Sequence, residues 1–196
     1  MNFRNVSKLV PGAVCALFLV GCAAPGFFSL GGTIPTQNPE KTGPRYVANF
    51  GGFFDACDLE NTYGHVTYHD KYSTLGEVRL EGLVEDAAEC VETGDEGDFD
   101  CTRCREWVEE ATGEELVDFA EGAFLGYAKI RYRSQDMKNF DASENGVAYA
   151  CVADFGEGAG APDDDHLLMR VTTGPYAGYT NFGPVKGNIG HSGCEN

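Results

Sequence analysis

Apolar and polar residues alternate with a period of two through much of the sequence after residue 44, and this alternation constrains the fold most strongly. It places apolar side chains on one face of a β-strand and polar side chains on the other. The alternating segments are 65–69, 77–81, 128–133 and 167–172, and segments 46–54 and 146–155 are further candidate strands. Gly, Asn and Asp residues between them favour turns. The pattern predicts an all-β fold in which six or more antiparallel strands form a single barrel or a sandwich.

The segment 86–115 departs from this alternation because it is acidic and carries three cysteines. We interpret it as an insertion into one β-domain that spans 45–196. A length of about 150 residues is enough for one hydrophobic core and hardly enough for two. Residues 104–120 have the best helical pattern, but Gly113 interrupts it, so we expect at most one small helix.

The first 21 residues have the pattern of a secretory signal peptide. Arg4 and Lys8 supply the positive charge of such a signal, and an apolar stretch follows at 9–20. This stretch is too short for a transmembrane helix, which needs about 20 apolar residues. The pattern predicts that the chain is exported and that the signal, residues 1–21, is removed.

A short motif indicates where the signal is removed. Its residues are Leu19, Val20, Gly21 and Cys22. The motif resembles the lipobox of bacterial lipoproteins. The resemblance implies diacylglyceryl attachment to the Cys22 thiol, cleavage before Cys22, and acylation of the freed amine, so that palmitate-like chains anchor the protein to a membrane. Two or three such chains hold far more firmly than one. The alternative is an ordinary signal peptide that is cleaved after Ala24.

Residues 22–44 follow the lipobox and are rich in Gly and Pro. They show no period of 2 or of 3.6, so we interpret them as a flexible tether. Phe27, Phe28 and Leu30 are unusual in a tether and either lie at the membrane surface or dock onto the domain. Gram-negative lipoproteins that stay in the inner membrane often carry aspartate after the lipidated cysteine. Ala23 gives no such signal, so we expect the outer membrane of the cell envelope.

The formal charge of the chain is −17 at pH 7. Such an acidic surface repels nucleic acid phosphates and anionic lipid headgroups, which proteins normally bind with Lys and Arg. We therefore expect no nucleic acid partner. Cations, basic proteins of the envelope and neutral glycans remain open as partners.

Several short motifs resemble the post-COAP domain, a small all-β domain of exported bacterial proteins. The matching residues are Tyr68, His69, Asp70, Val152, Asp154, Gly156, Gly158, Asp165, Gly187, Asn188 and Ile189. Two features differ from the family: segment 86–115 has no counterpart, and Lys186 stands where the family has a glycine. The resemblance implies a fold and an extracytoplasmic location, and it implies no catalytic residues.

The chain has eight cysteines. Cys15 leaves with the signal and Cys22 takes the lipid. The remaining six are Cys57, Cys90, Cys101, Cys104, Cys151 and Cys194. In an exported domain they predict three disulfides, whose connectivity the sequence leaves open. Since three of the six lie in segment 86–115, at least one of those must bond to a cysteine outside the segment if all six pair.

Cys101 and Cys104 also form a Cys-x-x-Cys motif, for which we considered three other functions. A c-type haem site needs histidine directly after the second cysteine, and this chain has Arg105. A zinc site would combine Cys90, Cys101, Cys104 and a histidine, because Zn²⁺ prefers four N or S ligands. A thioredoxin-like pair normally follows a βαβ pattern, which is missing here. Structural disulfides are therefore the favoured interpretation.

The acidic segment 154–166 is a second candidate site. Its Asp and Glu oxygens on a glycine-rich loop suit Ca²⁺, which takes six to eight oxygen ligands. The candidate ligands are Asp154, Glu157, Asp163 and Asp165. The interpretation that we favour is a solvated connection between two strands of a hairpin, with no metal.

His65 and His69 share one face of their expected strand, and Asp70 follows them. This arrangement suits a metal site or an acid–base pair, but it is more typical of the polar side of a half-exposed strand. The sequence carries no Gly-x-Ser-x-Gly elbow, His-Glu-x-x-His motif or phosphate-binding loop.

These observations predict a cell-envelope lipoprotein whose disulfide-bonded β-domain is a structural or binding module and not an enzyme. The alternative is a calycin-like carrier whose barrel encloses a small apolar ligand. The carrier lacks support in the early sequence, because Trp107 is the only tryptophan and lipocalins carry an early Gly-x-Trp motif. An interior filled by side chains would favour the module, and an open apolar cavity would favour the carrier. An envelope hydrolase is a third alternative, with no motif to support it.

Overall fold

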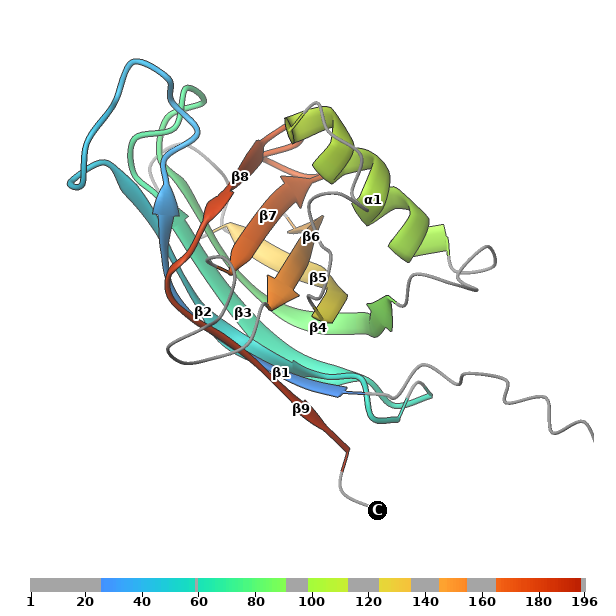
Figure 1. Ribbon diagram of the computed structural model, residues 1–196. Helices are drawn as coiled ribbons and strands as arrows, with labels where there is room; N and C mark the ends of the chain where they lie inside the picture. Colours follow the sequence, from blue (N-terminus) through green and yellow to red (C-terminus); the bar gives the residue numbers. More distant parts are fainter. Residues whose placement is uncertain are drawn as a thin grey trace, which may run out of the picture.

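The computed structural model describes residues 26–58, 60–90, 99–112, 124–134, 145–154 and 165–194. Within them the chain forms nine strands and one helix (Figure 1). These are β1 (Gly26–Pro35), β2 (Val47–Asp55), β3 (Tyr63–Asp70), β4 (Val78–Cys90), α1 (Phe99–Thr112), β5 (Phe124–Ser134), β6 (Asn145–Asp154), β7 (His166–Val171), β8 (Thr180–Pro184) and β9 (Lys186–Gly193). The strands form one antiparallel sheet in the order β8-β7-β6-β5-β4-β3-β2-β1-β9, which curls into a nearly closed barrel. The predicted all-β fold is confirmed.

The expected tether is wrong for residues 26–35, because these residues form β1. This strand pairs with β2 on one side and with β9 on the other. Phe28 is fully buried in the barrel and Leu30 is nearly so, whereas Phe27 faces outward. Burial of apolar side chains therefore orders a segment whose glycines had suggested flexibility. The β-domain begins by Gly26 and not at residue 45.

The expected boundaries of the insertion are also corrected. Strand β4 runs to Cys90 and pairs with β5 throughout that length, so residues 86–90 belong to the sheet. The register shifts between Val84 and Asp86, where one extra residue interrupts the strict alternation. The one helix of the described residues, α1, begins five residues before the expected start, and the expected residues 113–120 lie outside the described part of the chain.

Helix α1 lies on the outer surface of the barrel, beside β5, β6 and β7 (Figure 1). A disulfide joins Cys104 in α1 to Cys151 in β6, with the two Cα atoms 5.8 Å apart. Val108 packs with Tyr149 and Leu168 in a small apolar cluster under the helix. The expectation that a cysteine of segment 86–115 bonds to the rest of the domain is confirmed.

The interior of the barrel is filled by apolar and aromatic side chains. The largest of those that are fully buried there include Tyr68, Tyr132, Tyr179, Phe28, Phe54, Ile34, Leu80, Ile130, Leu167, Met169 and Ile189. The packing is close enough to require glycine at specific positions. A Cβ atom on Gly126 would lie 2.8 Å from Cζ of Phe28, which is far inside van der Waals contact. The aromatic ring therefore fills the volume that a side chain at this position would need.

The barrel closes through its last strand, which changes partner along its length. The first part, β8, pairs with β7, and the second part, β9, pairs with β1. The bend between them lies at Val185, whose N–H donates to the backbone carbonyl of Asp165 at 2.7 Å. Nearby, Asn181 Nδ2 donates to the carbonyl of Pro35 at 2.9 Å, which connects β8 to the end of β1.

Because the last strand changes partner, one side of β9 has no neighbouring strand, and we call this gap the seam. Two carboxylates bridge it. The Asp165 carboxylate accepts the N–H of Ile189 at 2.8 Å, and the Asp154 carboxylate accepts the N–H of His191 at 2.7 Å. Residues two apart in a strand direct their N–H groups to the same side, so these are the donors that β1 does not use. We call Asp154 and Asp165 the seam carboxylates. They satisfy a strand edge that has no neighbouring strand.

This arrangement changes the interpretation of segment 154–166. It does connect two antiparallel strands, β6 and β7, as expected for a hairpin. The expectation that Asp165 is simply solvated is wrong, because its carboxylate holds β9. Asp154 is 4% exposed and also bonds to β9. Glu157 and Asp163, the other two candidate calcium ligands, lie outside the described residues.

Replacing Asp165 with alanine should destabilise the fold, because the N–H of Ile189 would lose a charged acceptor. A hydrogen bond to a charged group contributes about 1.5–3 kcal/mol, so we expect a loss of about 2 kcal/mol in the free energy of unfolding, measured by urea titration. Glu109→Ala, on the exposed face of α1, is the matched control and should change stability by less than about 0.5 kcal/mol. Equal stability of the two variants would contradict the role given to the seam carboxylates.

Candidate functional site

The histidines and the aspartate that the sequence placed together lie on opposite faces of β3. His65 and His69 face outward, where each Nε2 contacts a glutamate of the neighbouring chain segment, Glu81 at 2.9 Å and Glu77 at 2.7 Å. Asp70 faces inward and is fully buried. No group of three or more metal-ligating side chains occurs among the described residues. His65 and His69 thus share the outer face of β3, as their even spacing predicts, and Asp70 does not join them there.

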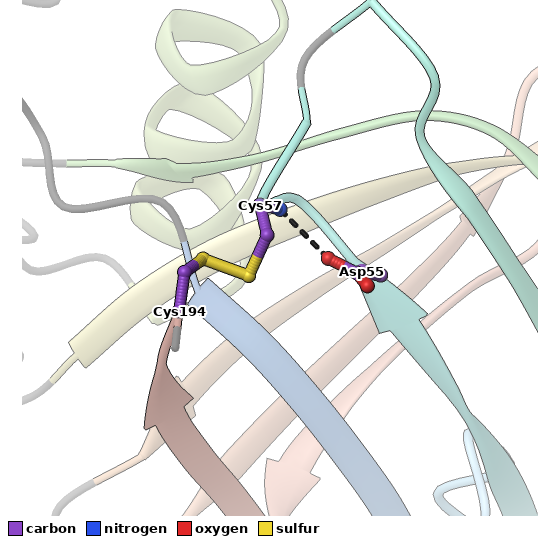
Figure 2. Close-up of a disulfide and its surroundings, with 3 residues drawn as sticks. All are labelled: Asp55, Cys57 and Cys194. Atoms are coloured by element: carbon purple, nitrogen blue, oxygen red, sulfur yellow. Dashed lines mark hydrogen bonds between the residues drawn. A yellow bond between two sulfur atoms is a disulfide. The ribbon is translucent and has the colours of Figure 1, made fainter. Parts of the chain in front are cut away.

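The cysteines lie in disulfides at two separate places. Cys57 bonds to Cys194, Cys104 bonds to Cys151, and Cys90 is disulfide-bonded as well. The side chain of Cys101 and the whole of Cys22 lie outside the described part of the chain. Figure 2 shows the Cys57–Cys194 bond, with Asp55 accepting the N–H of Cys57 at 2.7 Å. Since Cys57 follows β2 and Cys194 follows β9, this disulfide crosses the beginning of β1, which lies between those strands.

Asp70 organises the opposite end of the barrel, where β1 ends and β3 ends. Its carboxylate accepts four hydrogen bonds, from Thr36 Oγ1 at 2.6 Å, Gln37 N at 3.2 Å, Tyr72 N at 3.0 Å and Tyr179 OH at 2.9 Å. Four donors match the lone-pair sites of a carboxylate, so the buried charge is fully solvated by the protein. Two of the donors begin the β1–β2 loop and one begins the β3–β4 loop. One buried side chain thus fixes the start of both loops.

A chain of hydrogen bonds extends from Asp70 across the barrel interior. Tyr179 OH donates to the carboxylate, so the Tyr68 OH, 2.7 Å away, must donate to Tyr179. Asn181 Nδ2 in turn donates to the Tyr68 oxygen at 2.8 Å. Burial raises the pKa of both tyrosines, and the nearby Asp70 charge raises the pKa of Tyr179 further. Both hydroxyls therefore stay protonated at physiological pH and keep this donor order.

The β1–β2 and β3–β4 loops are bonded to each other above Asp70. Asn38 Nδ2 donates to the carbonyl of Tyr72 at 3.0 Å, and Thr74 Oγ1 donates to Gln37 Oε1 at 2.8 Å. The ring of Tyr46 packs edge-on against that of Tyr72, with ring centroids 5.0 Å apart. These contacts hold the two loops as one unit.

A groove of about 480 Å³ lies along the β1–β2 loop, and we call it the loop groove. Its lining residues are Thr33, Ile34, Pro35, Thr36, Asn38, Pro39, Lys41, Thr42, Gly43, Pro44, Tyr46, Val47 and Lys186. Gly43 has a φ of 102°, a backbone conformation that favours glycine, and the N–H of Tyr46 donates to its carbonyl at 3.1 Å. This turn brings Tyr46 and Lys41 back toward the strands, and Lys186 at the start of β9 completes the wall.

The loop groove carries positive charge in a chain that is strongly acidic. Lys41 and Lys186 line it, while Glu40, the acidic residue of the same loop, does not. Arg45 lies over the Tyr46 ring with Cζ 4.6 Å from the centroid, and Lys71 Nζ lies 5.9 Å from the centroid of Tyr72. Among the described residues, none of these four cations forms an ion pair with a carboxylate. The groove therefore presents cations that have no direct ion-pair partner beside aromatic rings.

Two other hollows are weaker candidates. A depression of about 470 Å³ on the outer face of β3, β4 and β5 has walls of mixed charge, in which His65 pairs with Glu81 and Arg131 with Glu85. The depression thus carries charges of both signs, with Arg133 as a second cation in its lining. The space under α1, beside Cys104, holds only about 20 Å³, which is hardly more than one water molecule needs. The loop groove combines volume with unpaired charge and is the candidate site.

No family model matches this sequence, and no curated protein or solved structure matches it either. The resemblances to the lipobox and to the post-COAP domain therefore remain predictions. In the described part of the chain, no helix is long and apolar enough to cross a membrane. The function must be argued from the geometry of this chain alone.

Sequence reasoning missed the loop groove because its residues were assigned to the tether. Lys41, Arg45 and Tyr46 lie in or next to the segment 22–44, and Lys186 lies far away in the sequence. The pairing of Thr33 with Lys186 joins the two parts. A local signal was present in Lys41 and Arg45, which are two cations within five residues of an acidic chain.

Removing the Tyr179 hydroxyl should destabilise the protein and change its response to alkali. Tyr179→Phe leaves Tyr68 and Asp70 each without one partner, which we expect to cost about 1–3 kcal/mol at pH 8. In the wild type, the raised pKa values of both tyrosines mean that stability is fully present below pH 10 and falls as the pH rises above it, because the unfolded tyrosines ionise near pH 10. Urea titrations at pH 8 and pH 11 should show a smaller fall for Tyr179→Phe.

Tyr72→Phe is the control for this measurement, because the Tyr72 hydroxyl takes part in no hydrogen bond of the described residues. It should leave both the stability at pH 8 and the fall at pH 11 close to those of the wild type. An identical alkaline fall in Tyr179→Phe and wild type would contradict the assigned burial of the hydroxyl pair.

Proposed function

We propose that this chain is a cell-envelope lipoprotein, anchored in the outer membrane through acyl chains on Cys22, whose barrel is a binding module and not an enzyme. The observation that carries the module is the filled interior, which leaves the loop groove on the outside as the site for a ligand. A calycin-like carrier needs a cavity among the inward-facing side chains, and Phe28, Tyr132 and Met169 occupy that space. The proposal includes no cofactor besides the lipid.

The ligand that suits the loop groove is an anionic saccharide unit of the envelope. Lys41 and Lys186 offer charge-assisted hydrogen bonds to a carboxylate or phosphate group. Threonine hydroxyls and Asn38 suit sugar hydroxyls, and the proline rings offer apolar contact. A long polyanion such as nucleic acid is disfavoured, because it would extend beyond the groove over the surface of a strongly acidic chain.

The two ends of β1 indicate how the anchored barrel is oriented relative to the membrane. Gly26 begins β1 beside the Cys57–Cys194 disulfide, since its carbonyl accepts the N–H of Ala56, and Pro35 ends β1 among the lining residues of the loop groove. A strand of ten residues spans about 33 Å, since each residue contributes about 3.3 Å. With Cys22 only four positions before Gly26, the groove faces away from the membrane. A ligand in the envelope space can then reach it.

The lipid anchor is tested with Cys22→Ser. Without the thiol no acyl chain is attached, so we expect the exported protein to move from the membrane fraction to the soluble fraction after detergent-free lysis. Cys15→Ser is the matched control, since Cys15 belongs to the removed signal, and it should leave the protein in the membrane fraction. A processed Cys22→Ser protein that stays with the membrane would show that the anchor lies elsewhere.

The ligand class is tested by binding of a labelled trigalacturonate and of glucosamine phosphate to the wild type. The charge-reversed double variant Lys41→Glu/Lys186→Glu should lose affinity for the preferred probe by at least about tenfold, which corresponds to about 1.4 kcal/mol. Arg133→Glu makes the same kind of charge change on the exposed face of β5 and should bind like the wild type. Binding of neither probe, or equal loss in both variants, would contradict an anionic saccharide site in the groove.

A further inference from the structure

Three aromatic side chains form a cluster on the outer surface of the barrel, and we call it the aromatic patch. It consists of Phe27 in β1, Phe53 in β2 and Tyr63 at the start of β3. The rings of Phe27 and Phe53 are stacked with centroids 5.8 Å apart, and Phe53 meets Tyr63 edge-on at 6.0 Å. Tyr63 is 56% exposed, and the other two are partly exposed.

The alternation of the strands explains why these rings face outward. Their sequence neighbours Phe28 and Phe54 stack on each other inside the barrel, with centroids 4.7 Å apart, so Phe27 and Phe53 must point the other way. The strand positions that face outward further along β1 and β2 carry small or polar residues, such as Ser29, Gly31 and Asn49. Large apolar surface is therefore concentrated at one end of this face, which soluble surfaces normally avoid.

The aromatic patch lies where the chain enters the barrel. Phe27 is the second residue of β1, and the N–H of Ala56, just after β2, donates to the carbonyl of Gly26 at 2.9 Å. The chain from Cys22 to Gly26 has four residue steps, which span at most about 14 Å when fully extended. Acyl chains on Cys22 would consequently hold this end of the barrel within a short distance of the bilayer surface.

We propose that the aromatic patch is inserted in the interfacial layer of the membrane and fixes the orientation of the anchored barrel. This inference rests on the lipid attachment proposed above. Aromatic side chains favour the headgroup level of a bilayer, where the rings meet apolar chains and a tyrosine hydroxyl remains hydrated. The lipid and the patch together make two points of contact, so the barrel cannot rotate freely about its anchor.

The negative charges around the aromatic patch determine which lipid headgroups it can approach. The side chain of Tyr63 bonds to the carboxylate of Asp55, which raises the pKa of Tyr63, and Asp58 and Glu60 follow in the β2–β3 loop. These carboxylates would be repelled by an anionic surface. The patch therefore suits a zwitterionic headgroup layer, such as phosphatidylcholine or phosphatidylethanolamine.

The test places a tryptophan at each end of the barrel and asks which one reaches the lipid. Tyr63→Trp puts it in the aromatic patch. Leu75→Trp, in the β3–β4 loop at the opposite end, is the matched control, because Leu75 is 57% exposed and therefore as accessible as Tyr63. Each full-length lipidated protein is incorporated in phosphatidylcholine vesicles with and without bromine on the acyl chains, which quenches tryptophan on contact. The signal of Trp107, measured in the unsubstituted protein, is subtracted.

We expect strong quenching of the tryptophan at position 63 and none at position 75. A second variant, Phe27→Gln/Phe53→Gln in the Tyr63→Trp background, should still float with the vesicles but lose the quenching, because the anchor remains while the apolar contact is gone. If the proteins float but quenching is equally weak at both positions, the proposed insertion of the patch would be wrong and the lipid anchor would still be supported. Proteins that fail to float would overturn the anchor and the patch together. If the tryptophan at position 63 is not quenched and the protein self-associates, the patch would be assigned to contact with a second copy, and the membrane proposal would be wrong.

Discussion

The structure depends on how the last strand closes the barrel. β8 and β9 are one continuous stretch that leaves β7 and joins β1, and such a change of partner necessarily leaves N–H groups of β9 without a strand beside them. Backbone donors buried away from water need acceptors, and Asp154 and Asp165 supply them from the end of β6 and the beginning of β7. The seam is therefore made of two charge-assisted hydrogen bonds where a ladder would otherwise run. Because β1 is held by β9, the position of the first strand depends on these same two carboxylates.

This dependence links the two ends of the molecule. β1 is a central strand of the sheet, bonded to β2 and β9, with the Cys57–Cys194 disulfide across its beginning and Asp70 under the loop at its end. In a protein anchored just before β1, any pull on the anchor acts along this strand and is resisted by both ladders at once. The loops that form the groove are fixed by Asp70 at the other end, about ten residues away. The groove and the end of the barrel at which β1 begins are thus joined by one strand that is hydrogen-bonded on both sides.

Part of this architecture could be predicted from the sequence, because alternation is a local signal. The strictly alternating segment 65–69 lies within β3, and segment 128–133 lies within β5 but misses the first four residues of that strand. β1 was missed since Gly31 and Gly32 remove the apolar–polar contrast over its middle, and β8 and β9 were missed because Gly183, Pro184 and Gly187 resemble a loop. The function of Asp154 and Asp165 could not be read either, as their partners lie 37 and 24 residues away. The sequence of an aspartate-rich segment does not distinguish a metal site from a solvated loop or from acceptors for the N–H groups of another strand.

The net charge of the chain does not determine the charge at the candidate site. The net charge of −17 makes the electrostatic potential negative at a distance from the molecule, and this potential disfavours long polyanions. At physiological ionic strength, however, the Debye length is about 8 Å, so exposed charges further away contribute little to the potential in the loop groove. The lining of the groove carries Lys41 and Lys186 and no carboxylate, while the buried Asp70 carboxylate lies behind the lining residue Thr36, whose Oγ1 donates to it at 2.6 Å. Arg45 and Lys71 are held beside the groove by tyrosine rings rather than by acidic side chains, so their charge is not cancelled. The proposed anionic ligand must therefore be short enough to remain inside the groove, beside its two lysines.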